Sequence, residues 1–201
     1  MRRSAMDSRL ECDNADDLWV FGYGSLMWRP GFEFLESAPA RLIGLHRALC
    51  VYSFVHRGTP EKPGLVLGLD RGGACRGMAF RVAAGARATT IDYLRSREQV
   101  TKVYLETWRT VTVWGKPERR VRALAFCVDR GHPQYAGRLS LDRQLHLVRE
   151  GHGRSGINRD YVLSTVEALE ALGCYDHDLH LLAERLKSAH HPHPASATAS
   201  L

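Results

Sequence analysis

The chain has 201 residues, of which 44% are hydrophobic and 25% charged, which is enough for one globular domain with a substantial apolar core. Its formal net charge of +6 comes almost entirely from arginines spread along the sequence, so it does not by itself indicate a nucleic-acid partner. No stretch reaches the roughly 18 consecutive apolar residues of a membrane span, and residues 1–17 lack the apolar segment of a signal peptide. These features predict a cytoplasmic protein that does not bind a membrane.

The first predicted element is a strand over Leu18 to Tyr23, which leads into a glycine-rich loop. Gly22 and Gly24 allow the main chain to adopt positive φ and to bring N–H groups close to an anion or oxyanion. A dinucleotide fingerprint needs a third glycine where Met27 stands, and a P-loop needs a Gly-Lys-Ser/Thr ending, so nucleotide binding is not indicated. Ser25 also lacks the flanking glycines of a nucleophile elbow. The loop is therefore either a ligand-binding loop or an ordinary turn after a strand.

A long strand is predicted over Ala40 to Ser53, followed by a polar loop over His56 to Gly64 that its prolines and glycines shape into a turn. Arg57 in this loop and Arg47 in the strand before it are candidates to clamp a carboxylate with two parallel hydrogen bonds. Arginines on loops are commonly solvated, and this alternative stays open for both.

A helix is predicted over Thr90 to Glu98. Helical periodicity places Ile91, Leu94 and Glu98 on one face, so the glutamate occupies an apolar position. Desolvation there raises the pKa of a carboxyl group, which favours proton transfer near neutral pH. The alternative is a structural salt bridge of Glu98 with Arg95 or with another arginine.

Strand character extends over four further segments, and three amphipathic helices follow near the end of the chain. The strand segments are Leu65 to Leu69, Cys75 to Val82, Arg109 to Val113 and Val121 to Val128, and the helices are Leu141 to Arg149, Arg159 to Leu172 and Asp178 to Lys187. Ser140 and Asn158 are predicted as N-terminal caps, and Gly173 as a helix end. Because strands dominate early and helices late, the sequence predicts a mixed α+β domain on a mostly antiparallel sheet or small barrel, with helices outside.

Two polar stretches lie among these later elements. Arg119, Arg120 and Arg122 form a tight basic cluster after a predicted hairpin turn over residues 115–118, and we interpret them as a solvated turn and strand edge. The glycine-rich residues 151–156 are predicted either as a flexible connector or as a source of N–H groups and a cation for an acidic ligand.

The five cysteines are odd in number and contain no C-x-x-C pair, so neither a disulfide framework nor a zinc site is indicated. Cys12, Cys50, Cys75, Cys127 and Cys174 are widely spaced, and three of them lie in strand-like segments, which is typical of small buried side chains rather than catalytic thiols. Histidines 190, 191 and 193 lie in a Pro/Ala/Ser-rich tail, where ordering a metal site costs conformational entropy. No metal and no cofactor are expected.

Taken together, these motifs resemble the ChaC family of γ-glutamylcyclotransferases, in which a Val-Phe-Gly-Tyr-Gly-Ser-Leu loop precedes an Arg-Glu pair. Here the loop is Val20 to Leu26 and the pair is Arg97 and Glu98. Leu26 stands where the smaller cyclotransferases for γ-glutamyl amines and γ-glutamyl amino acids usually have asparagine, which favours ChaC. The resemblance extends over residues 18–187 and also includes Arg47, His56, Arg57, Gly58, Pro60, Lys62, Pro63, Gly64, Tyr135, Ala136, Gly137, Ser155, Gly156, Asn158 and Tyr161.

The resemblance implies a γ-glutamylcyclotransferase-like fold over residues 18–187, and we expect residues 1–17 and 188–201 to be disordered. It also implies cleavage of glutathione to 5-oxoproline and cysteinylglycine, through attack of the α-amine on the γ-amide, without water, metal or cofactor. Glu98 is then the general acid/base. The implied substrate-binding residues are Val20, Phe21, Gly22, Tyr23, Gly24, Ser25 and Leu26, and those that bind substrate or shape the site are Arg47, Arg57, Tyr104 and Tyr161.

The chain departs from the family directly after the Arg-Glu pair. Bacterial-type members commonly continue Met-x-Thr-Gly-x-Tyr, whereas this chain has Gln99 and Lys102 in place of the methionine and glycine, and keeps Thr101 and Tyr104. A cyclotransferase for another γ-glutamyl amino acid or amine is therefore an alternative. A non-catalytic ligand- or RNA-binding module is the alternative from a different class, based on the arginine content.

Overall fold

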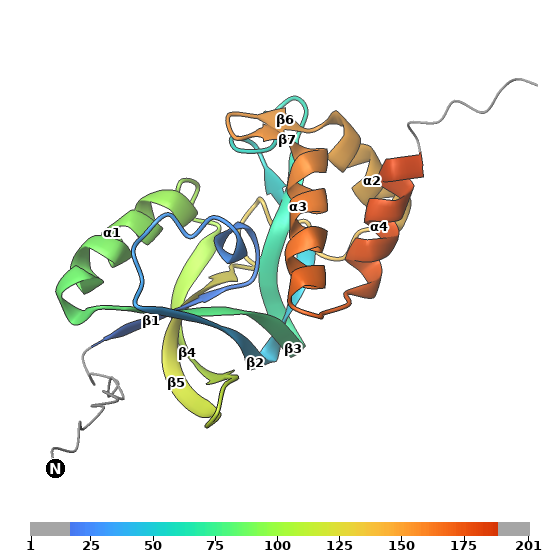
Figure 1. Ribbon diagram of the computed structural model, residues 1–201. Coiled ribbons are helices and arrows are strands. Elements are labelled where there is room, and N and C mark those ends of the chain that lie inside the picture. Colours follow the sequence, from blue (N-terminus) through green and yellow to red (C-terminus); the bar gives the residue numbers. More distant parts are fainter. Residues whose placement is uncertain (1–16, 189–201) are drawn as a thin grey trace, which may run out of the picture.

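The computed structural model describes residues 17–188, and its centre is a closed five-stranded barrel (Figure 1). The strands are β1 (Leu18–Gly22), β2 (Glu36–Ser53), β3 (Gly64–Val82), β4 (Tyr104–Val113) and β5 (Arg119–Val128). They follow the order β1-β3-β2-β4-β5, with antiparallel pairing between neighbours. Short parallel pairings of β5 with β1 and β3 close the barrel. The predicted mixed, mostly antiparallel barrel is confirmed.

Strand β3 joins two segments that the sequence analysis separated, 65–69 and 75–82. Gly72 and Gly73 lie between these segments with φ of +95° and +66°, and Gly44 on the partner strand has φ of +90°. The register of β2 against β3 shifts at this point. The glycines therefore bend the β2–β3 pairing without ending it, because they tolerate the left-handed conformation that a bulge requires.

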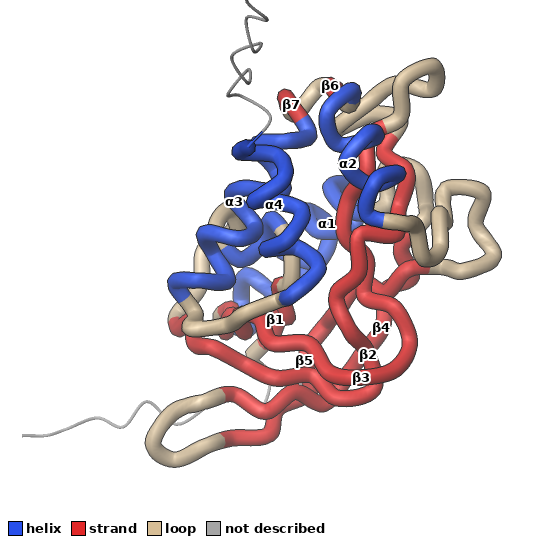
Figure 2. Tube along the Cα trace, turned by 90° about the vertical axis from the view of Figure 1, so that its right-hand side faces the viewer, coloured by secondary structure: helices blue, strands red, loops and turns tan. Residues whose placement is uncertain are grey.

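Helices cover the barrel on two sides, with α1 on one side and α2, α3 and α4 together on the other (Figures 1 and 2). The four helices are α1 (Arg87–Glu98), α2 (Leu141–Glu150), α3 (Asn158–Ala171) and α4 (His177–Ser188). Shorter elements are the 3₁₀ turns η1 (Ser25–Met27) and η2 (Ala84–Ala86) and a hairpin of β6 (His152–Gly153) and β7 (Gly156–Ile157). Within residues 17–188 no helix is both long and apolar enough to cross a membrane.

Strand β1 is buried along its whole length because its alternate side chains face two different cores. Leu18 and Val20 pack in the core that includes Leu94 of α1. Trp19 and Phe21 belong to the larger core that extends to α2, α3 and α4. The strand that leads to the glycine-rich loop is thus held from both sides.

Of the three residues predicted to begin or end helices, Ser140 and Gly173 do so and Asn158 does not cap its helix. Ser140 caps α2, since its hydroxyl accepts the Arg143 N–H at 3.3 Å, and Gly173 ends the turn after α3 with φ of +60°. Asn158 is not a cap, because it is the first residue of α3. Its fully buried side-chain amide binds Leu65 of β3 instead, accepting the N–H at 2.6 Å and donating to the C=O at 2.8 Å.

The interpretation of the basic cluster needs one correction. The hairpin turn between β4 and β5 is confirmed, and Arg120 and Arg122 are exposed. Arg119, however, pairs with Glu36 and lies over the ring of Trp19 at 5.3 Å, so its side chain is partly buried against β1 and β2 and is not a solvated edge residue.

The described part begins and ends one residue beyond the predicted domain. Asp17 accepts the N–H of Ala84 at 3.0 Å and pairs with Arg81 at 3.2 Å, and Ser188 is the last residue of α4. The rest of the predicted disordered segments, Cys12 and histidines 190, 191 and 193 lie outside the described residues. The other four cysteines are free and buried; burial was predicted for Cys50, Cys75 and Cys127, which lie in strands, and Cys174 is buried as well.

Candidate active site

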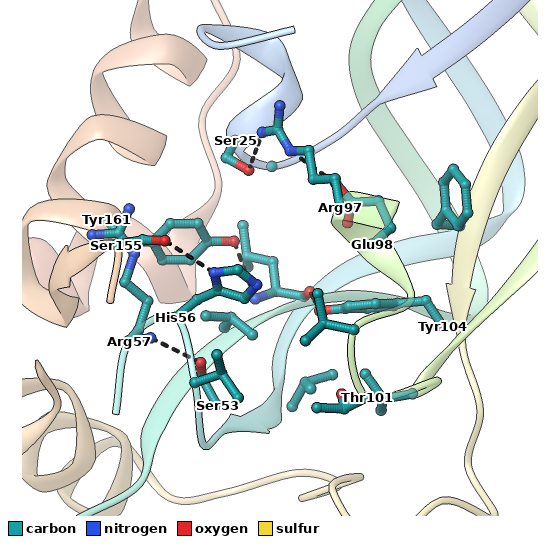
Figure 3. Close-up of a pocket in the computed structure, with 18 of the residues that line it drawn as sticks. Ser25, Ser53, His56, Arg57, Arg97, Glu98, Thr101, Tyr104, Ser155 and Tyr161 are labelled. Atoms are coloured by element: carbon teal, nitrogen blue, oxygen red, sulfur yellow. Dashed lines mark hydrogen bonds and ion pairs between the residues drawn. The ribbon is translucent and has the colours of Figure 1, made fainter. Parts of the chain in front are cut away.

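A cavity of about 340 Å³ opens where β1 ends, and it contains most of the polar residues singled out from the sequence (Figure 3). Its walls come from the loop after β1, the end of β2 and the loop that follows, the C-terminal end of α1, β3, β4, the β6–β7 turn and α3. Elements far apart in the chain therefore meet at one end of the barrel.

The glycine-rich loop forms one wall of the cavity through its second half. Tyr23, Gly24, Ser25 and Leu26 line it, and the first hydrogen bond of η1 runs from the Met27 N–H to the Gly24 carbonyl at 2.9 Å. The N–H groups of Ser25 and Leu26 precede that bond and have no acceptor within the turn. Because Ser25 and Leu26 both line the cavity, their N–H groups are candidate donors to an anionic oxygen bound there.

The first half of the predicted binding stretch does not reach the cavity. Val20 and Phe21 are fully buried in the two cores. Gly22 instead permits a close fold, since a Cβ there would lie 2.9 Å from the Cβ of Leu26.

Arg47 supports the loop from behind and does not line this cavity. Its Nε donates to the Tyr23 carbonyl at 2.6 Å, a second nitrogen binds the Arg76 carbonyl, and a third lies 3.6 Å from Asp176. It faces a separate cavity of about 400 Å³. Arg47 was predicted either to bind substrate or to shape the site, and its position fits the second of these roles.

Glu98 is the last residue of α1 and lines the cavity, with 18% of its side chain exposed. Burial raises the pKa of its carboxyl group, and the positive charge of Arg97 opposes this shift. The salt bridge with Arg95 considered from the sequence is not formed, because Arg95 pairs with Glu106 at 2.7 Å and with Asp92 at 3.7 Å. The other form of that alternative, an ion pair with another arginine, is present, because the Nε of Arg97 lies 3.3 Å from the Glu98 carboxylate.

Arg97 also connects α1 to the loop that follows β1. Its guanidinium donates to the Ser25 hydroxyl at 3.0 Å and to the carbonyls of Arg29 and Pro30 at 2.6 and 3.0 Å. This bracing keeps the end of α1, and with it Glu98, beside η1 (Figure 3).

Three tyrosines interact electrostatically with Glu98: the buried Tyr23 and Tyr161 and the half-buried Tyr104. Burial raises the pKa of each hydroxyl, and the nearby Glu98 carboxylate raises it further, so all three are protonated at neutral pH. The Tyr104 hydroxyl donates to the Leu67 carbonyl at 2.7 Å, and the Leu67 N–H donates to the Tyr161 oxygen at 3.3 Å. Since Tyr161 accepts this bond, its own hydroxyl proton is available to a ligand.

The opposite wall is formed by the loop after β2 and the β6–β7 turn, which are joined by main-chain hydrogen bonds. The Arg154 and Ser155 N–H groups donate to the Val55 and His56 carbonyls at 2.8 and 2.9 Å. A Cβ at Gly153 would lie only 2.5 Å from the Val55 oxygen. The stretch 151–156 is therefore a docked hairpin and not a flexible connector.

His56 and Arg57 face the cavity from this wall (Figure 3). A ring nitrogen of His56 lies 2.9 Å from the Ser155 hydroxyl, and burial together with nearby arginines lowers the pKa of the imidazole. Arg57 lies over the ring of Tyr161 at 5.3 Å and donates to the Ile157 carbonyl at 3.1 Å.

Sequence reasoning missed several lining residues, including Tyr52, Tyr93 and Gln134. The amide of Gln134 donates to the Tyr52 carbonyl at 2.7 Å, a contact between distant segments that no local pattern reveals. Lys102, which stands at a family glycine position, has φ of +59°. The left-handed conformation is thus present without the glycine that usually provides it.

No group of three or more His, Cys, Asp or Glu side chains within residues 17–188 is arranged to hold a metal ion. The lining of the cavity instead combines a single carboxyl group, Glu98, with main-chain donors, hydroxyls and arginines. Such a site suits proton transfer and the binding of anionic groups.

Comparisons with known proteins identify relatives over nearly the whole described chain. Residues 18–189 match the family model described as ChaC-like protein. The glutathione-specific γ-glutamylcyclotransferase of Escherichia coli (strain K12) is 34% identical over 187 residues, covering 92% of this chain and 80% of the relative. The human glutathione-specific γ-glutamylcyclotransferase 1 is 31% identical, covering 83% and 76%. A crystal structure of a γ-glutamyl cyclotransferase specific to glutathione from yeast superposes with a TM-score of 0.80 at 21% identity, covering 88% of this chain and 99% of that one.

Proposed function

This chain belongs to the ChaC family, and on that premise we propose that it is a γ-glutamylcyclotransferase that converts glutathione into 5-oxoproline and cysteinylglycine. The observation that carries the proposal is the position of Glu98, a carboxyl group with a raised pKa that lines the same cavity as the glycine-rich loop. The names of the relatives support glutathione as the substrate.

The reaction is an internal ring closure. The α-nitrogen of the γ-glutamyl group forms a bond to the γ-carbonyl carbon, and the amide C–N bond to cysteine breaks, so no water is consumed. The substrate amine enters as an ammonium ion, which must lose a proton before it can attack. Glu98 accepts that proton and then donates it to the departing amide nitrogen. The α-nitrogen loses a second proton when it becomes the ring amide, and the released amine takes up a proton to leave as an ammonium ion, so the carboxyl group returns to its starting state.

The rest of the site positions the substrate and stabilises charge. Holding the γ-glutamyl group folded brings the amine close to the carbonyl and removes much of the entropic barrier to ring closure. The N–H groups of Ser25 and Leu26 and the Tyr161 hydroxyl provide donors for the anionic oxygens of the substrate. Arg47 and Arg97 hold the loop that presents these donors.

We place the reaction in the cytoplasm, with a small-molecule substrate and without a nucleic-acid partner. The free state of the four described cysteines supports a reducing compartment. The nucleic-acid alternative was based on the arginine content, and several of these arginines form ion pairs within the protein, among them Arg119 with Glu36 and Arg95 with Glu106.

The test is to incubate the purified protein with glutathione, without added metal, and to measure 5-oxoproline and cysteinylglycine by mass spectrometry. We expect equal amounts of both products, and Glu98→Gln lowers kcat by about 10²- to 10⁴-fold, the usual contribution of general acid–base catalysis. Thermal unfolding of the variant serves as the folding control. Full turnover by a folded Glu98→Gln protein would refute the role of this residue, and turnover only of other γ-glutamyl compounds would refute glutathione as the substrate.

A further inference from the structure

Arg57 lies in the cavity wall without an acidic partner. Its guanidinium donates to the Ile157 carbonyl and packs over the Tyr161 ring, and no carboxylate within residues 17–188 lies within ion-pair distance of it. A guanidinium has five N–H donors, so most of those of Arg57 remain available to a ligand. A half-buried arginine with several N–H donors still available is suited to bind a carboxylate with two parallel hydrogen bonds.

The surroundings of Arg57 are positively charged. Burial lowers the pKa of Arg57, and Arg29 lowers it further, while Tyr161 and Asp160 act in the opposite direction. Among residues 17–188, Glu98 is the single acidic residue that lines the cavity. This wall therefore has an unbalanced positive charge that favours an anionic ligand.

Arg57 and Glu98 approach the cavity from different sides. In Figure 3, Arg57 and Ser155 lie at one end of the Tyr161 ring, whereas Glu98 lies beyond the end that carries the hydroxyl. A ligand that contacts both residues must therefore have the group that binds Arg57 and the group that binds Glu98 at well-separated positions.

Glutathione has this distribution of charge. Its ammonium group and one carboxylate belong to the γ-glutamyl end, which the proposed mechanism places near Glu98 and the glycine-rich loop. Its second carboxylate belongs to the glycine at the other end of the tripeptide. If the first end lies at Glu98, the wall that contains Arg57, at the far end of the Tyr161 ring, is in position to meet the second carboxylate.

We propose that Arg57 binds the glycine carboxylate of the substrate and thereby selects γ-glutamyl peptides that carry it over those that lack it. This inference rests on the proposed function, since that function fixes which end of the peptide lies at Glu98. It assigns to the loop after β2 a role in recognising the departing dipeptide, separate from the chemistry of ring closure.

The experiment compares glutathione with glutathione amide, in which the glycine carboxylate is a neutral amide and the γ-glutamyl group is unchanged. We expect the wild-type kcat/KM for 5-oxoproline formation to be about 10- to 100-fold higher for glutathione, because hydrogen bonds to charged groups are worth more than neutral ones. Arg57→Gln lowers the value for glutathione by a similar factor and leaves that for the amide nearly unchanged. Arg57→Lys retains part of the preference.

Arg154→Gln is the matched control, because Arg154 is exposed in the β6–β7 turn that is hydrogen-bonded to the loop of Arg57, and it does not line the cavity. It is expected to keep the wild-type preference. Loss of the preference in this variant would show that diffuse charge, and not contact with Arg57, discriminates between the two peptides. An equal loss for both peptides in Arg57→Gln would also overturn the inference, since it indicates a structural role or a contact with the γ-glutamyl carboxylate.

Binding to Glu98→Gln, measured by calorimetry, separates this inference from the proposed function. A stronger affinity for glutathione than for its amide, abolished by adding Arg57→Gln, supports the subsite even if the wild-type protein makes no 5-oxoproline. Turnover of glutathione without any preference over the amide overturns the subsite and leaves the proposed function intact. Absence of both turnover and binding preference overturns both.

Discussion

Two opposing influences set the protonation of Glu98. Burial favours its neutral form, and the guanidinium of Arg97 at 3.3 Å favours the carboxylate. Because burial has the larger effect, the carboxyl group gains and loses a proton closer to neutral pH than an exposed glutamate does. This property is what a residue needs if it accepts a proton from one amine and gives it to another.

A pH dependence follows from the raised pKa of Glu98. The folded protein holds a proton at this site at pH values where the unfolded chain has lost it, so the contribution of Glu98 to stability falls as pH rises. Over the same interval kcat/KM rises, because the carboxylate is the form that accepts the ammonium proton. Urea unfolding of wild type and Glu98→Gln at a series of pH values measures the change in stability. Turnover of glutathione by the wild-type protein at the same pH values measures the change in kcat/KM. A stability difference between the two proteins that stays constant with pH would contradict the assignment.

At the residue scale, the sequence identified Glu98 because helical spacing put a carboxyl group on an apolar face. It did not reveal that Arg47 supports the loop from behind, since its partners are the Tyr23 carbonyl and Asp176, which only the folded chain brings together. Asn158 was misjudged for the same reason. The Asn158 side chain could cap the helix or bind a distant strand, and the local sequence does not show which of these hydrogen-bond partners it takes.

At the element scale, the contact between α3 and β3 fixes one wall of the cavity. Asn158 binds both main-chain groups of Leu65, and Gly64 and Gly151 fit tightly around it, since a Cβ at these glycines would lie within 3.0 Å of the asparagine side chain. Tyr161, one turn further along α3, then reaches the Leu67 N–H. Asn158 therefore positions the helix that carries a cavity residue.

Asn158→Ala is expected to lower the free energy of unfolding by about 2–5 kcal/mol, because it leaves two buried main-chain groups without partners. Ser140→Ala at the start of α2 removes a cap bond on the exposed surface, and we expect a smaller loss of about 0.5–2 kcal/mol. Urea unfolding of both variants makes the comparison. Equal losses would mean that the buried contact is not the stronger of the two.

The elements themselves were largely predictable, because apolar alternation and helical periodicity are strong in this chain. The division of β3 into two strands was wrong, since glycines such as Gly72 and Gly73 end a strand in one context and form a bulge in another. Partner strands decide between these outcomes, and the pairing of β2 with β3 is not visible in either sequence segment alone.

At the scale of the whole molecule, the barrel closes through short parallel contacts of β5 with β1 and β3. Strands so far apart in the chain leave no local signal of their pairing, and the barrel architecture was predicted through the family resemblance and the order of elements. The cavity lies between the two helical layers. A ligand bound there contacts both layers and stabilises the assembled molecule relative to the unfolded chain.

Glutathione is therefore expected to stabilise Glu98→Gln, which binds the peptide without consuming it. At a concentration about 100 times Kd, the free energy of unfolding rises by about 2.7 kcal/mol. Thermal unfolding over a concentration series measures the effect, with cysteinylglycine alone as the control. A melting temperature that does not change with glutathione concentration would argue against binding at this site.

The burial of the cysteines has a consequence for a protein that works on a thiol peptide. Thiol–disulfide exchange requires a thiolate that is accessible to the attacking disulfide. Burial raises the pKa of Cys50 to about 12 and that of Cys75 to about 11, so neither forms a mixed disulfide readily. In a Cys12→Ser variant we expect mass spectrometry to detect no adduct after incubation with oxidised glutathione, until urea unfolds the chain; rapid adduct formation in the folded variant would refute this. The fold thus keeps its own sulfur atoms out of the redox chemistry of the substrate pool.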